Sequence, residues 1–316
     1  MTIRILLDTL VTGLPLVPAV LAIYLVFRIR DDFDLTVDGS LALGGAVTAV
    51  TVVAGWPPLA ALAVAVLVAA AMGAVTAGLH FAFRIPVLLA GLVMSIGLFS
   101  VTLHVLGQPT VGVDFTDTLF APFLDLPSRT ADTATSATLA AIVVLAVGAV
   151  ALFLRTEIGL ALRATGVNAV MARSHGVNDR RLLVVSLILA NGLAGLSGAL
   201  VVQTQGFADV NMGTGTFVAG IGAVLLGELL VRPTGSRILR IALCVVVGAL
   251  CYRLILVGAL RLGLPAADLR GATAVTLLAA VAAQRWGRPL FGRIGRALPS
   301  RLPARSRDRA PSAEGI

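Results

Sequence analysis

The sequence predicts an all-α membrane protein, built as a polytopic transmembrane helix bundle of about nine membrane segments. Hydrophobic residues make up 58% of the 316 residues and charged residues only 13%, too few to cover the surface of a soluble domain of this length. Apolar runs recur along the whole chain, most of them near the roughly 20 residues that a helix needs to cross a bilayer. Short polar stretches separate the runs, as loops between membrane spans would.

The apolar runs define nine predicted segments, taken in chain order. Pro15 and Pro18 are expected to kink the first one, because proline removes a helical hydrogen bond. The second and the seventh are short. The segments are Leu6–Phe27, Leu41–Ala54, Leu59–Phe83, Val87–Leu106, Leu139–Leu154, Leu182–Val202, Thr216–Val231, Ile238–Leu260 and Gly271–Ala283.

Arginine supplies the whole positive charge behind the net +8, because the chain contains no lysine. The stretches 155–181 and 232–240 and the tail from 285 are rich in arginine, whereas 107–136 carries four aspartates against one arginine. Arginine-rich loops stay in the cytoplasm. We therefore expect a multi-pass protein of the bacterial plasma membrane with its N-terminus outside and its C-terminus in the cytoplasm. The positive charge favours a lipid bilayer surface as partner and not nucleic acid.

The composition also predicts how the chain divides. Residues 1–291 are expected to form one transmembrane domain. Residues 292–316, rich in Arg, Pro and Ser, are expected to form a basic, disordered cytoplasmic tail.

The polar stretch between the fifth and sixth segments contains the start and stop signals of two short helices. Thr156 is placed to cap the first, with an acidic residue in its first turn, and Gly166 to end it. Asn168 is placed to cap a second helix over Ala169–His175, which Gly176 would end. Two capped helices between membrane spans indicate a docking surface for another protein.

Two polar, glycine-containing stretches resemble each other. Asp34–Ser40 (DLTVDGS) precedes the second segment and Asp209–Thr216 (DVNMGTGT) leads into the seventh. Each follows a full span, and the predicted sidedness makes those two spans run in opposite directions. An inverted repeat with broken helices would produce this pattern. A chance likeness between glycine-rich stretches is the alternative.

Polar side chains within or beside the apolar runs are candidates for lining a transport pathway, because polar groups are costly at membrane depth. The alternatives are an ordinary helix cap at the membrane surface, hydrogen bonds between helices, or an outer turn. Glu228 is explained by an ion pair with Arg232 at the end of its helix. The pathway candidates are Asp34, Thr36, Asp38, Ser40, Asn191, Gln203 and Gln205.

The residues do not favour an enzyme. A phosphate-binding loop of the Walker type needs a lysine, and the sequence has none, so any ATP must be hydrolysed by another chain. Gly195-Leu-Ser-Gly198 resembles the serine motif of rhomboid proteases, but no histidine is placed to act as base for Ser197, and helix packing explains it better. No cluster has metal-ligand spacing. We expect no catalytic residue, no metal and no cofactor.

Three stretches in order along the chain carry a family resemblance. They are DLTVDGSLALGGAVTA, EIGLALRATGVNAVMARSHGVN and SGALVVQTQGFADVNMGTGTFVAGIGAVLLGE. They resemble the permease subunits of ribose-type and branched-chain amino acid ABC importers. The form LTVDGS is similar to that of a subgroup assigned to tryptophan and tyrosine import.

This resemblance implies a permease subunit for a small solute, with an amino acid of aromatic type favoured. It implies ABC ATPase subunits that use the ATP, an extracytoplasmic substrate-binding protein, and a second permease copy or paralogue. It places ATPase coupling in the stretch 155–181. The residues that match the family pattern there are Arg163, Ala164, Thr165, Gly166, Asn168, Met171, Ala172 and Gly176. An ion-coupled secondary transporter, with Asp34 or Asp38 in its ion site, and a non-transporting scaffold are the alternatives.

Overall fold

The computed structural model describes residues 2–282, except 232–236, 266–267 and 270. Seven of its helices are long and apolar enough to cross a membrane, and two shorter apolar helices, Thr216–Leu230 and Gly271–Ala282, accompany them. These nine helices lie at the nine predicted positions. The tail predicted at 292–316 lies outside the described residues.

The first span is a succession of helix types. It consists of α1 (Thr2–Gly13), the 3₁₀ turn η1 (Leu14–Leu16), α2 (Val17–Ile23) and the π-helical η2 (Tyr24–Arg30). The α-helical pattern changes at Pro15, because proline has no N–H to donate. The Pro15 carbonyl accepts a hydrogen bond from Ser197 Oγ at 2.7 Å, which fixes this break against a later helix.

The other helices follow in chain order, and the longest connection, 107–127, lies between α5 and α6. The second predicted segment starts five residues earlier than expected, at Thr36, and the fifth starts eleven residues earlier, at Ser128. The remaining elements are α3 (Thr36–Val53), α4 (Pro58–Phe83), α5 (Val87–Leu106), β1 (Thr110–Gly112), η3 (Phe115–Asp117), η4 (Ala121–Phe123), α6 (Ser128–Phe153), α7 (Glu157–Val167), α8 (Ala169–Ser174), α9 (Asp179–Gln205), β2 (Phe207–Asp209), α10 (Thr216–Leu230) and α11 (Arg237–Arg261).

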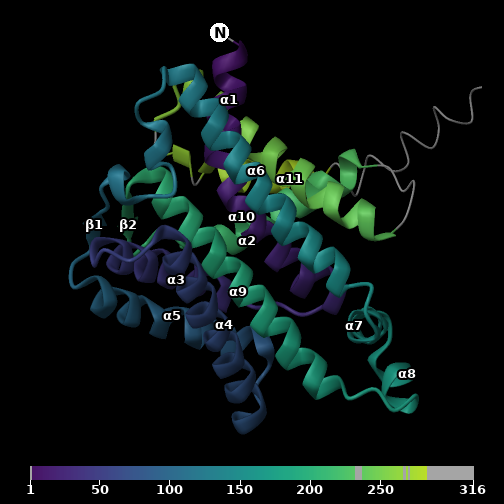
Figure 1. Cartoon of the computed structure of the whole chain (residues 1–316). Helices are drawn as coiled ribbons and strands as arrows, with labels where there is room; N and C mark the ends of the chain where they lie inside the picture. Colours follow the sequence, from purple (N-terminus) through teal and green to yellow (C-terminus); the bar gives the residue numbers. More distant parts are fainter. Residues whose placement is uncertain (1, 232–236, 266–267, 270, 283–316) are drawn as a thin grey trace, which may run out of the picture.

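The bundle has two distinct ends (Figure 1). The short helices α7 and α8 form one of them, which we call the α7–α8 end. The antiparallel pair of β1 and β2, in which Val111 faces Ala208, marks the other, the β1–β2 end. Helix α9 runs the whole distance between the two ends. The depth of a residue in the bundle can therefore be stated by the residue of α9 that it contacts.

Helix α9 is the centre of the packing, with α3 and α4 lying against it. Glycines allow this close approach. The positions that a Cβ of Gly44, Gly198 and Gly73 would occupy are taken by backbone atoms of Gly195, Leu41 and Leu187 respectively. Small residues let membrane helices touch through their backbones, so the bundle is tightly packed around α9. By contrast, only 33%, 28% and 28% of the spanning windows of α4, α5 and α6 are buried, against 72% for α9.

Candidate functional site

Two helices begin inside the bundle and not at its ends. After the first span, residues 31–35 turn back and α3 starts at Thr36. Asp34 and Ser40, on either side of this start, both form hydrogen bonds with Asn191 near the middle of α9, so α3 begins at about the depth of Asn191. After α9, residues 210–215 return along α3 and α10 starts at Thr216. Helix α3 then runs to the β1–β2 end and α10 to the α7–α8 end. These are the broken, oppositely directed helices that an inverted repeat requires.

Asp34 forms the centre of a buried polar network at the start of α3. Its Oδ1 accepts a hydrogen bond from the Thr36 backbone N–H at 2.9 Å, and its Oδ2 accepts one from the Asn191 amide at 2.8 Å. Ser40 Oγ donates to Asn191 Oδ1 at 2.7 Å. The Thr36 hydroxyl lies 2.9 Å from the hydroxyl of Thr76 in α4. The network therefore joins α3, α4 and α9.

The network is closed to its surroundings. The side chains of Asp34, Thr36, Ser40, Thr76 and Asn191 are all fully buried. A Cβ on Gly91 of α5 would lie 2.7 Å from Asp34 Oδ1, so α5 packs its backbone directly on the carboxyl group. Four of these five residues are predicted pathway residues, namely Asp34, Thr36, Ser40 and Asn191. In this conformation they face neighbouring helices, so their role in lining a pathway stays a prediction.

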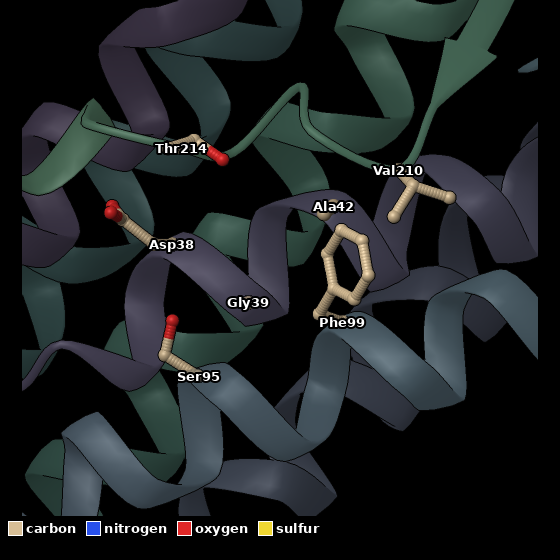
Figure 2. Close-up of a pocket in the computed structure, with 7 residues that line it drawn as sticks. All are labelled: Asp38, Gly39, Ala42, Ser95, Phe99, Val210 and Thr214. Atoms are coloured by element: carbon tan, nitrogen blue, oxygen red, sulfur yellow. The ribbon is translucent and has the colours of Figure 1, made fainter. Parts of the chain in front are cut away.

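Asp38, four residues after Asp34 and in the first turn of α3, has a different environment. Its Oδ1 and Oδ2 accept hydrogen bonds from the backbone N–H groups of Phe217 (2.7 Å) and Gly215 (3.0 Å), so it caps the start of α10. The same side chain is half-buried and borders an open pocket of about 80 Å³ (Figure 2). Of the predicted pathway residues within the bundle, Asp38 is the one that reaches open space.

The two predicted glutamines lie near the β1–β2 end of α9. Gln203 is fully buried and clamps two connections, accepting from the Leu119 N–H at 3.0 Å and donating to the Pro58 carbonyl at 3.3 Å. Gln205 is exposed at the last position of the helix. Neither is brought together with the Asp34 network.

The predicted helices of the 155–181 stretch are present. The Gly159 N–H donates to Thr156 Oγ1 at 3.2 Å and the Met171 N–H donates to Asn168 Oδ1 at 2.9 Å, so both predicted N-caps are confirmed. Gly176 has the left-handed φ of +80° expected of a residue just past a helix end. The prediction for Gly166 was wrong, because α7 continues through it to Val167.

Gly166 instead joins α7 to the first span. A Cβ there would overlap the carbonyl oxygen of Ile29 in η2, so only glycine permits this contact. Next to it, the buried Arg30 forms an ion pair with Asp179 at the start of α9 at 2.6 Å, and with Asp32 at 3.3 Å. Burial raises the pKa of Asp32, against the opposing effect of Arg30. Arg173 of α8 also pairs with Asp179 at 3.6 Å, so the α7–α8 unit contacts both the first span and the start of α9.

The outer face of α7 and α8 is apolar and exposed. Leu160, Val167, Val170 and Met171 expose 59%, 86%, 70% and 56% of their surfaces, and we call these four residues the α7–α8 patch. The buried side of the same helices contains Leu162. Of the residues matching the family pattern, Thr165 and Ala172 are buried, Arg163, Ala164 and Gly166 are half-buried, and Asn168, Met171 and Gly176 are exposed.

Some contacts were not foreseen from the sequence. Arg30 is buried although it is the last residue of the first span. Ser95 and Phe99 of α5 border the pocket, yet each is one unremarkable residue in an apolar run. Glu228 binds Arg28 of η2 at 2.6 Å, while its predicted partner Arg232 lies outside the described residues.

A multi-pass helix bundle with broken helices inside it and a capped helix pair at one end defines a membrane transport permease. The chain belongs to the permeases of branched-chain amino acid and ribose-type ABC transporters. The family profile described as "Branched-chain amino acid transport system / permease component" matches residues 5–282. The chain is accordingly a transport subunit and not an enzyme.

Individual relatives agree with this assignment. The chain is 30% identical to the "Tyrosine transport system permease protein" of Clostridioides difficile, over 83% of this chain and 85% of that protein. It is 33% identical to the "Uncharacterized protein RP368" of Rickettsia prowazekii, over 71% and 77%. It is also 33% identical to the "Ribose import permease protein RbsC" of Escherichia coli K12, over 61% and 60%. No solved structure matches.

Proposed function

We propose that this permease provides the membrane pathway of an ATP-driven importer for an amino acid, and that a separate ATPase binds the α7–α8 patch. The observation that carries the proposal is that an exposed apolar patch sits on a unit fixed to two membrane spans. Apolar side chains clustered on a connection between spans favour a protein partner. The importer uses the ATP at its partner subunit, so this chain needs no cofactor and no metal.

The contacts at the base of α7 explain how motion would pass into the membrane. Gly166 touches the Ile29 carbonyl and Arg30 binds Asp179, so α7, the end of the first span and the start of α9 move as one body. Asp34 follows Arg30 by four residues and fixes the start of α3. A shift of the patch therefore reaches the broken helix through a short, packed path, as rigid-body coupling requires.

The substrate class is inferred from a relative. The C. difficile protein is named for tyrosine transport and aligns over most of both chains, whereas the ribose permease aligns over a smaller share. We therefore favour an aromatic amino acid. The complete importer would contain ATPase subunits, an extracytoplasmic binding protein and a second permease copy or paralogue. The N-terminus would lie outside the plasma membrane and α7 and α8 in the cytoplasm.

Met171→Glu tests the docking site. Position 171 is the third residue of α8 behind the Asn168 cap, where an acidic side chain is favourable, so the helix itself should be kept. We expect the ATPase to be lost from the purified complex and tyrosine uptake to fall at least about tenfold, equivalent to about 1.4 kcal/mol of coupling.

Leu124→Glu is the matched control. Leu124 has a similar exposed fraction, 51%, but lies at the β1–β2 end. The ATPase should still co-purify with this variant. If Met171→Glu retains both the ATPase and tyrosine uptake, the patch is not the docking site.

A further inference from the structure

The pocket beside Asp38 is built by three separate elements at the middle of the membrane. It lies between the first turns of α3, the middle of α5 and the returning segment 210–215 (Figure 2). Ser95 is the ninth of the 20 residues of α5, which places the pocket about halfway along that span. Its volume is about 80 Å³. Its lining residues are Asp38, Gly39, Ala42, Ser95, Phe99, Val210 and Thr214.

Two glycines hold the walls of this pocket together. A Cβ on Gly39 would lie 2.8 Å from Leu98 Cβ and 3.2 Å from Ser95 Cα, so α3 and α5 touch at this point. A Cβ on Gly213 would overlap the Asp38 carbonyl, so the returning segment also lies directly on α3. The pocket is therefore a fixed feature of the packing and not a gap between loosely packed helices.

The polar groups of the pocket are unsuited to lipid. Asp38 is half-buried and Thr214 is exposed, and both border the pocket together with Ser95 of the middle of α5. A carboxyl group that faces hydrocarbon is strongly unfavourable. This face is thus expected to border the aqueous pathway, whereas the network around Asp34 is sealed inside the bundle.

The lining residues favour a ligand that carries a positively charged group next to an apolar group. Asp38, Ser95 and Thr214 place their oxygens at one side of the pocket, while Ala42, Phe99 and Val210 line the other (Figure 2). No lysine, arginine or histidine is among these lining residues. The two N–H groups that bind Asp38 leave part of its capacity of about four acceptor sites free. A primary ammonium group can donate three hydrogen bonds to such a set.

The size of the pocket limits what it can hold. At about 80 Å³ it is well below the roughly 300 Å³ at which pockets enclose a whole small ligand. It has room for an ammonium group and the carbon that bears it. The rest of an aromatic amino acid would remain in the pathway beyond Phe99.

We propose that this pocket is the subsite at which the permease receives the α-ammonium group of the amino acid it transports. The inference rests on the proposed function, since it concerns the substrate of that same pathway. It assigns Asp38 as the acceptor, Ser95 and Thr214 as hydroxyl partners, and Phe99 as the apolar wall next to the side chain of the substrate.

Thiol labelling at Ser95 tests the subsite without relying on transport. In the assembled complex with Cys244→Ala and Cys251→Ala, Ser95→Cys is treated with 2-aminoethyl methanethiosulfonate, which carries an ammonium group, and with the 2-sulfonatoethyl reagent. We expect the ammonium reagent to react about tenfold faster relative to free thiol, because one negative charge concentrates cations locally. Asp38→Asn should remove most of this preference.

Ser100→Cys on the exposed side of α5 is the matched control and should show little preference. L-Tyrosine should slow labelling at Ser95→Cys, and 3-(4-hydroxyphenyl)propionate, which lacks the ammonium group, should not. The subsite proposal would be overturned if the two reagents label Ser95→Cys at equal rates, each relative to its rate with free thiol. Equal protection by the two compounds would also overturn it. These comparisons use protein that keeps Asp38, so they remain valid even if the Asp38→Asn variant does not assemble.

Uptake assays separate the two proposals. If the unsubstituted complex takes up no tyrosine, the proposed function fails whatever the labelling shows. The other case is that the unsubstituted complex does take up tyrosine. If the Asp38→Asn complex, with its ATPase still bound, then transports tyrosine at the same rate, the subsite proposal fails while the proposed function stands.

Discussion

Asp34 and Asp38 are four residues apart at the start of the same helix, yet they are held in opposite ways. Asp34 is fully buried, with both oxygens bound by groups that belong to α3 and α9. Asp38 caps a different helix and opens onto a pocket. The first aspartate joins helices into a fixed unit, and the second lies where the two broken helices meet open space. The sequence pattern alone assigns both to the same class of pathway candidate.

The largest expected effect separates the two aspartates by stability. Asp34→Ala leaves the Asn191 amide and the Thr36 N–H without their acceptor inside the bundle, so we expect a loss of about 2–5 kcal/mol in the free energy of unfolding. Asp38→Ala removes a helix cap at a half-buried site and should cost about 1–2 kcal/mol. Thermal unfolding of the purified complexes measures the difference, and a larger loss for Asp38→Ala would reverse the comparison.

A smaller effect tests how tightly the Asp34 network is sealed. Gly91→Ala places a methyl group against Asp34 Oδ1 and the Leu35 N–H, and we expect a loss of about 1–3 kcal/mol from overpacking. Gly97→Ala, in the same helix but with open space around its Cβ, should be neutral or stabilise by up to about 1 kcal/mol. Similar unfolding temperatures for the two variants would show that α5 does not close the network.

The smallest effect measures a single hydrogen bond of the network. Thr36→Val and Thr76→Val each remove the hydrogen bond between the two hydroxyls and should each lower the free energy of unfolding by about 1 kcal/mol. The double variant removes both hydroxyls and should lose less than the sum, with a coupling of about 0.5 kcal/mol or more. Additive losses would mean that the two hydroxyls do not interact.

The sequence was sufficient for features that depend on local pattern. The nine apolar segments, the caps Thr156 and Asn168 and the left-handed Gly176 are all read from residues within one or two helical turns. The two short polar stretches also correctly marked where helices start inside the bundle. Periodicity, capping and glycine conformation are short-range effects, so a single sequence displays them.

Contacts between distant parts of the chain could not be predicted in this way. The Asp34–Asn191 hydrogen bond joins residues 157 positions apart, and the local sequence around either residue does not indicate which residue it will bind. Gly166 looks like a helix terminator, and its actual contact with Ile29 depends on how two spans are placed. Ser95 becomes part of a pocket only because Gly39 lets α5 approach α3. Such features follow from packing, which the sequence determines only through the whole fold.

Uptake into vesicles tests the central claim most directly. The permease is reconstituted with its ATPase subunits and binding protein, and entry of radiolabelled L-tyrosine is followed with ATP supplied on the α7–α8 side. We predict uptake that requires ATP hydrolysis, persists when ion gradients are dissipated, and is not matched by ribose. Uptake that continues without the ATPase subunits but stops when the ion gradient is removed would contradict the account and identify an ion-coupled transporter.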